Sequence, residues 1–189
     1  MTKVAVIIAA VVIAATAAVF FYIGLFDRMD FSCASRGPYR LIYREYRGPY
    51  RTVPFIVNNV CRYARDTLRI ATATPFALYY DRPRLTGGEM LRSICGVIAD
   101  SVPPLKPGLR KGTFHTTDAA VGSFRLRGFF SPAIGAHKFY SALPRYLEKK
   151  NLRQRGPVME IYDSKLHRIY FVAPTGTPGD STPLFPDDT

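Results

Sequence analysis

One short predicted strand, residues 158–162, carries the clearest chemical potential in this sequence. Because side chains alternate along a strand, Glu160 and Tyr162 lie on one face, and Met159 and Ile161 lie on the other. A carboxylate in the middle of a sheet is costly unless it is solvated, paired or used to bind a cation. We predict that Glu160 lines a binding cleft with Tyr162 and Tyr50. The alternative is a strand whose outer face meets water.

Motifs of catalysis and metal binding are missing from the sequence. It contains no phosphate-binding glycine loop, no His-Glu-x-x-His helix and no Gly-x-Ser-x-Gly elbow. The histidines are far apart, and the odd number of cysteines without a close pair predicts free, buried thiols. These residues are His115, His137 and His167, and Cys33, Cys61 and Cys95. We therefore expect a protein that is not an enzyme and that has neither a cofactor nor a metal site.

An internal repeat organises the elements around these residues. The segment from Arg47 to Asp81 matches the segment from Arg127 to Asp163 in order and almost in length, which indicates a duplicated unit. In this alignment Leu78 stands where Glu160 does, so the carboxylate breaks an apolar pattern.

Each repeat is predicted to contain a strand, a helix and two further strands. Apolar periodicity and turn residues place strands at 39–46, 76–80 and 92–98, and then at 119–127, 158–162 and 166–172. Helices are expected at 53–68 and 134–151, the second with a kink or a restart at Pro144. Turn geometry explains Gly87 and Gly88. The Pro-rich segment 101–112 is the predicted linker.

The predicted fold class is α+β. An N-terminal transmembrane helix, within residues 1–28, precedes one domain at 36–173, with repeats at about 39–100 and 113–172. Two fused β-α-β-β units would place helices on one face of an antiparallel sheet, leaving the other face or the cleft between halves for a ligand. Residues 174–189 are expected to form a short Pro-rich flexible tail.

The membrane helix is predicted from residues 4–26, which contain no charge and would extend roughly 34 Å as a helix. A cleaved signal peptide is the alternative, because Ala15-Thr16-Ala17 fits a cleavage pattern. Lys3 alone precedes the span and arginines follow it, which places the C-terminal part in the cytosol. The formal net charge of +12 suits an anionic leaflet or a solvated basic surface.

Three segments carry a resemblance to a known family. The Gly48-Pro49-Tyr50 turn, residues 79–83 and residues 157–162 resemble GyrI-like small-molecule-binding domains. This resemblance implies a duplicated β-α-β-β domain, and Glu160 matches the position of the pocket glutamate in many such domains. With the membrane anchor, the arrangement is similar to single-pass receptors for selective autophagy of the endoplasmic reticulum.

The resemblance implies a cytosol-facing adaptor of the endoplasmic reticulum membrane with a lumenal N-terminus. It further implies a role in reticulophagy and in DNA–protein crosslink repair, with autophagy modifier proteins as partners and with the autophagosome and nuclear envelope as further locations. Direct binding of nucleic acid is not expected. The alternative is a protein that binds a small hydrophobic or cationic ligand, or haem, in the cleft. A hydrolase is a second alternative.

Overall fold

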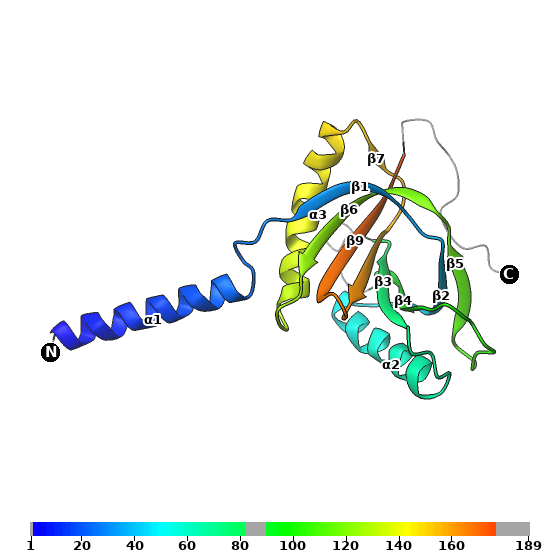
Figure 1. Ribbon diagram of the computed structural model, residues 1–189, viewed down its shortest axis with the longest axis horizontal. Coiled ribbons are helices and arrows are strands. Elements are labelled where there is room, and N and C mark those ends of the chain that lie inside the picture. Colours follow the sequence, from blue (N-terminus) through cyan, green and yellow to red (C-terminus); the bar gives the residue numbers. More distant parts are fainter. Residues whose placement is uncertain (1, 82–89, 177–189) are drawn as a thin grey trace.

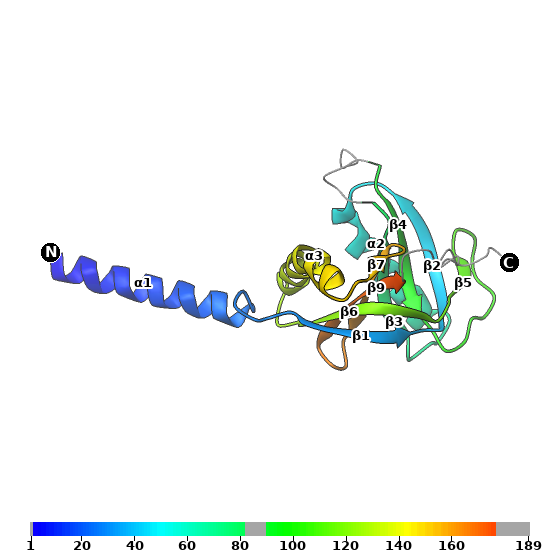
Figure 2. The same ribbon diagram turned by 90° about the horizontal axis from the view of Figure 1, so that it is seen from above.

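The computed structural model describes residues 2–81 and 90–176, which form an N-terminal helix and one folded domain (Figure 1). Helix α1 (Thr2–Tyr22) is exposed along its length and is long and apolar enough to cross a membrane. It extends away from the domain in both views (Figures 1 and 2). The chain therefore combines a candidate membrane span with a domain that folds outside it.

Helix α1 ends earlier than the apolar run predicts. The amide of Leu25 donates to the carbonyl of Phe20, and that of Gly24 donates to Phe21, which is the hydrogen-bond pattern of a Schellman cap. Gly24 has φ +82°, a conformation that residues with a side chain rarely adopt. Residues 24–26 are apolar but lie beyond the helix because the glycine ends it.

The domain contains two units that follow the same order of elements. The first unit consists of β1 (Asp30–Arg36), β2 (Tyr39–Arg47), the 3-10 helix η1 (Tyr50–Thr52), α2 (Val53–Asp66), β3 (Thr74–Tyr79) and β4 (Arg92–Ile98). The second unit consists of β5 (Arg110–Phe114), β6 (Thr117–Arg125), α3 (Ser131–Lys149), β7 (Arg153–Gln154), β8 (Val158–Asp163) and β9 (Arg168–Gly176). The predicted α+β class and the duplicated unit are confirmed.

The strands form an antiparallel sheet in the order β1-β6-β9-β8-β3-β4-β2-β5, with β7 pairing β9. The order is symmetric about the β8–β3 pair. The first strand of each unit joins the other unit, because β1 pairs β6 and β5 pairs β2. The two units have exchanged their outer strands.

Helices α2 and α3 cover one face of the sheet, as expected (Figure 2). The opposite face is filled by a buried cluster that includes Phe114 of β5, with Ala34 of β1 packed against it. Since β1 and β5 are the two ends of the sheet, the sheet must curve until its ends approach each other. Of the two predicted positions for a ligand, the open face of the sheet is therefore wrong, because core side chains occupy it; the cleft between halves stays a prediction.

Four further details differ from the sequence-based expectation. Strand β1 was not predicted, and β5 takes the end of the predicted linker. Helix α3 continues through Pro144 as one helix, so the predicted restart is wrong, while a kink there stays a prediction. Residues 174–176 belong to β9, whereas the rest of the predicted tail, from residue 177, and Gly87 and Gly88 lie outside the described residues.

Candidate functional site

Glu160 lies at the centre of the sheet, on the face that the helices cover. In the strand register, Ala77 of β3 and Phe171 of β9 stand on either side of it. Ala77 belongs to the cluster under α2, and Phe171 to the cluster under α3. Glu160 therefore occupies the junction between the two units.

The Glu160 carboxylate is buried and receives two hydrogen bonds. Its side chain is only 5% exposed. The Tyr162 hydroxyl donates to Oε2 at 2.8 Å, and the Tyr140 hydroxyl, from α3, donates to Oε1 at 3.4 Å. The interpretation of a strand face that meets water is wrong, because the sheet and α3 enclose the carboxylate.

Burial also changes the proton affinity of Glu160. Loss of hydration raises its pKa to about 7, while the hydrogen bonds from Tyr162 and Tyr140 act in the opposite direction. Among the described residues, no Lys, Arg or His lies within ion-pair distance of this carboxylate. Glu160 is thus a buried carboxyl that can ionise near neutral pH and has no countercharge among residues 2–81 and 90–176.

Two more tyrosines extend the site toward α2. Tyr79 of β3 is hydrogen-bonded to Tyr162, and burial raises its pKa far above the usual range. The Tyr79 ring meets the Tyr50 ring edge to face, with centroids 4.7 Å apart. We call Tyr50, Tyr79, Tyr140, Glu160 and Tyr162 the Glu160 cluster. It combines one carboxyl group with four tyrosine side chains, and aromatic rings together with an anionic group are chemistry that suits a hydrophobic cation.

Tyr140 has an unusual position in this cluster. It is 42% exposed overall, yet its hydroxyl reaches the buried carboxylate. The ring also lies edge to face against Phe171, with centroids 6.4 Å apart. Tyr140 is the one exposed residue of the five in the cluster. It lies where α3 meets solvent and covers Glu160.

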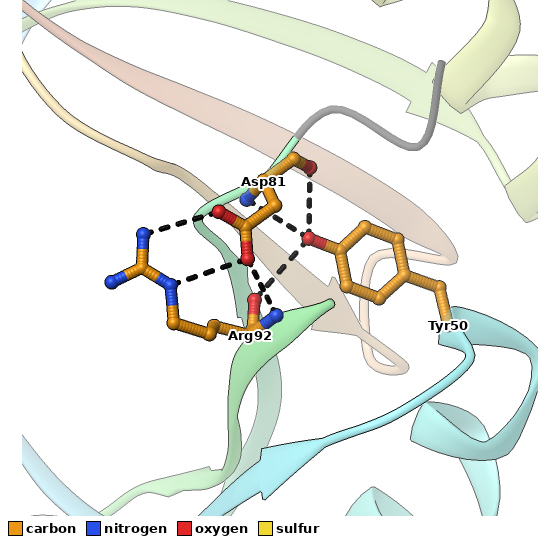
Figure 3. A network of polar contacts seen from close by, with 3 residues as sticks. All are labelled: Tyr50, Asp81 and Arg92. Atoms are coloured by element: carbon orange, nitrogen blue, oxygen red, sulfur yellow. Dashed lines mark hydrogen bonds and ion pairs between the residues drawn. The ribbon is translucent and has the colours of Figure 1, made fainter. Parts of the chain in front are cut away.

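The hydroxyl of Tyr50 is used elsewhere (Figure 3). It donates to the carbonyl of Asp81 at 2.8 Å and accepts from the amide of the same residue at 3.0 Å. The carbonyl of Arg92 lies 3.2 Å away, and the Arg92 side chain is paired with the Asp81 carboxylate. The Tyr50 hydroxyl therefore holds the ends of β3 and β4 together, and its ring alone contributes to the Glu160 cluster.

Of the three predicted residues, Glu160 and Tyr162 are in direct contact, and Tyr50 joins them through Tyr79. Sequence reasoning missed Tyr79 and Tyr140. The repeat alignment concealed Tyr79, because it matched Leu78 with Glu160, whereas Leu78 lies on the opposite face. Shifting that alignment by one residue pairs Ala77 with Glu160 and Tyr79 with Tyr162, which share a face. Tyr140 lies within the helix predicted at 134–151, but nothing in the local sequence indicated that its hydroxyl contacts Glu160.

Other groups with potential chemistry lie apart from the Glu160 cluster. All three histidines are exposed. The three thiols are free, but Cys95 alone is buried, while Cys61 is half-buried and Cys33 is exposed. Within residues 2–81 and 90–176, no group of three or more His, Cys, Asp or Glu side chains is placed to hold a metal ion.

Comparison with solved structures places this geometry in a known fold. The C-terminal domain of EcmrR superposes with a TM-score of 0.61 at 8% identity, over 79% of this chain and 98% of that domain. SAV2435, solved with tetraphenylphosphonium bound, gives a TM-score of 0.50 at 12% identity, over 78% of this chain and 94% of that one. The domain has the GyrI-like fold.

The EcmrR chain in its complex with DNA is longer than the matched domain. In the complex of EcmrR with DNA, the TM-score is 0.59 at 9% identity, and the match covers 87% of this chain but 65% of EcmrR. Neither protein-family models nor curated protein sequences match the chain. The similarity is therefore one of fold, and the chemistry of this domain depends on its own residues.

Proposed function

We propose that the GyrI-like domain binds a small hydrophobic cation at the Glu160 cluster, and that α1 holds this binding domain at a membrane. The observation that carries the proposal is the buried Glu160 carboxylate, which has tyrosine partners but no basic partner among the described residues. A bound cation would supply the missing countercharge, and the tyrosine rings would contact its apolar surface. The tetraphenylphosphonium bound to SAV2435, which shares the fold, supports this class of ligand.

A lipophilic cation fits the site better than haem. Haem proteins hold the iron through an axial side chain, commonly His, Cys, Met or Tyr. The three histidines are exposed and lie outside the Glu160 cluster. The hydroxyls of Tyr50 and Tyr162, within the cluster, already take part in hydrogen bonds. A positive organic ligand needs only the carboxylate and the rings.

Binding is tested with tetraphenylphosphonium as the probe. The full chain in detergent micelles is dialysed against the cation, with empty micelles as the blank for partitioning. We expect saturable binding that weakens at least about 30-fold in Glu160→Gln, since removing one partner of a buried charge pair typically costs about 2 kcal/mol or more. Triphenylphosphine oxide, which keeps the aromatic bulk without the net charge, should bind weakly.

Glu148→Gln is the matched control, because it removes one carboxylate from the exposed surface of the same helix that carries Tyr140. It should leave the affinity unchanged. Equal affinity in the Glu160→Gln variant, or uptake no greater than that of empty micelles, would overturn the proposal. Hydrolysis of an ester or adduct by the wild-type chain that disappears in Glu160→Gln would instead favour an enzyme.

The adaptor role remains a separate proposal. It rests on the sequence resemblance to testis-expressed protein 264, a single-pass receptor for autophagy of the endoplasmic reticulum, and on a candidate span joined to the GyrI-like domain. The structural neighbours support ligand binding more directly than this role. Protease protection of a C-terminal tag in microsomes tests the expected cytosolic orientation, since a protected tag would place the domain in the lumen.

A further inference from the structure

The end of α1 is bound to the domain by two basic side chains. Arg127, which follows β6, places Nη1 3.4 Å from the carbonyl oxygens of Phe21 and Tyr22, and Nη2 2.9 Å from the Asp27 carboxylate. Lys138 of α3 donates to the carbonyls of Leu25 and Asp27. Cations are favourable at the negative end of a helix. The domain is therefore attached directly at the point where the candidate span ends.

The loop between β6 and α3 exposes two aromatic rings beside this attachment. Phe129 is 92% exposed and Phe130 is 61% exposed, and their rings pack edge to face with centroids 5.3 Å apart. They begin two residues after Arg127. Adjacent exposed phenylalanines form an apolar patch, and such patches mark sites of contact with proteins or membranes.

The composition around these rings fits a membrane–water interface. Phe26, directly before Asp27, is exposed, and Arg28, directly after it, is also exposed. Aromatic side chains with neighbouring cations are typical of the region where acyl chains meet headgroups. The 21 residues of α1 extend roughly 31 Å, so its last turn would lie at that depth if the helix spans the bilayer.

The arrangement of the elements agrees with this position. Helix α3 and the loop before it form the side of the domain that faces α1 in both views (Figures 1 and 2). Strand β2 lies on the far side of the domain. A bilayer crossed by α1 would therefore meet the loop before most other parts of the domain.

We propose that the loop carrying Phe129 and Phe130 is a second membrane contact, which inserts its rings into the leaflet where α1 emerges. The occupant of this surface is the lipid interface, because the surface is continuous with the end of the span and carries aromatic and basic residues. Together with the Arg127 and Lys138 contacts, this contact would hold the domain in one orientation on the membrane. The inference requires that α1 crosses the bilayer, and it does not depend on ligand binding.

The chain contains no tryptophan, so a single introduced tryptophan reports its own environment. Phe129→Trp, in the full chain reconstituted into phosphatidylcholine–phosphatidylserine vesicles, should emit at shorter wavelength than tryptophan in water. It should lose most of its emission when the lipids carry bromine near the glycerol end of the acyl chains. Phe130→Trp gives an independent measurement if the first variant does not fold.

Two controls separate the ways in which the proposal can fail. Phe55→Trp lies on α2 at an exposed position and should show neither the shift nor the quenching. Phe21→Trp lies in the last turn of α1 and should be quenched. Quenching of Phe21→Trp without quenching at 129 and 130 would overturn the loop contact. Absence of quenching at position 21 would remove the span on which the inference rests.

Discussion

The Glu160 carboxyl illustrates how burial at a single residue links function to stability. The folded chain holds its proton more tightly than the unfolded chain does, because the pKa is raised from 4.5 to about 7. The stabilisation from this group is therefore complete below pH 4.5 and is lost as the pH rises through 7. A cation that binds the ionised carboxylate would restore stability above that pH.

This linkage predicts the pH dependence of a variant. Glu160→Gln cannot ionise, so its free energy of unfolding, relative to that of the wild type, should rise by up to about 3 kcal/mol between pH 4.5 and pH 8. Urea denaturation of the full chain at several pH values, without added cation, measures this difference. Glu148→Gln should show no such trend. A difference that stays constant with pH would mean that Glu160 does not titrate in this window.

At the scale of the element, the end of α1 depends on one glycine. A Cβ at Gly24 would lie 3.0 Å from Cζ of Phe124 and 3.1 Å from a carboxylate oxygen of Asp27, in a backbone conformation that is already unfavourable for alanine. The cap and the attachment of α1 to the domain therefore share this position.

Gly24→Ala should loosen the cap by about 1 kcal/mol, which corresponds to roughly fivefold faster hydrogen exchange at the amides of Gly24 and Leu25. Mass spectrometry of the full chain in nanodiscs measures the exchange of the peptide that contains them. Gly128→Ala is the control, because a Cβ there meets nothing within 4 Å. Unchanged exchange in Gly24→Ala would show that the neighbouring contacts hold the turn without the glycine.

At the scale of the whole molecule, the exchanged strands make the two units depend on each other. Phe114 of β5 is fully buried, in a cluster that also contains Val121 of β6 and Val172 of β9. Since β5 pairs with β2 of the first unit, neither unit can complete its part of the sheet alone. We expect the domain to unfold as one cooperative unit.

Phe114→Ala should therefore reduce the stability of both units equally, by about 3–5 kcal/mol, as a large cavity in a core does. Hydrogen exchange of β4 and of β9 should report the same loss of opening free energy. Lys111→Ala, at an exposed position on the same strand, should change neither. Loss of protection in β4 alone would show that the units unfold independently.

The whole-molecule arrangement also changes how the basic residues are understood. Arg40, Arg44 and Arg47 follow the span closely in the sequence, but they belong to β2, across the domain from α1 (Figure 1). Arg127 and Lys138, distant in sequence, bind the end of the helix instead. Charge counted along the chain cannot locate the charge in space.

The periodicity of strands and helices and the distribution of charge predicted several features of this protein from its sequence alone. The period of two in a strand placed Glu160 and Tyr162 on one face, the period of helices placed α2 and α3, and the uncharged run identified the candidate span. Only the tertiary structure decided that β1 and β5 exchange between units, that Tyr140 covers Glu160, and that core side chains fill the second face of the sheet. These features depend on hydrogen bonds and packing between segments far apart in the chain, and alternation within one segment contains no information about which distant segment lies against it.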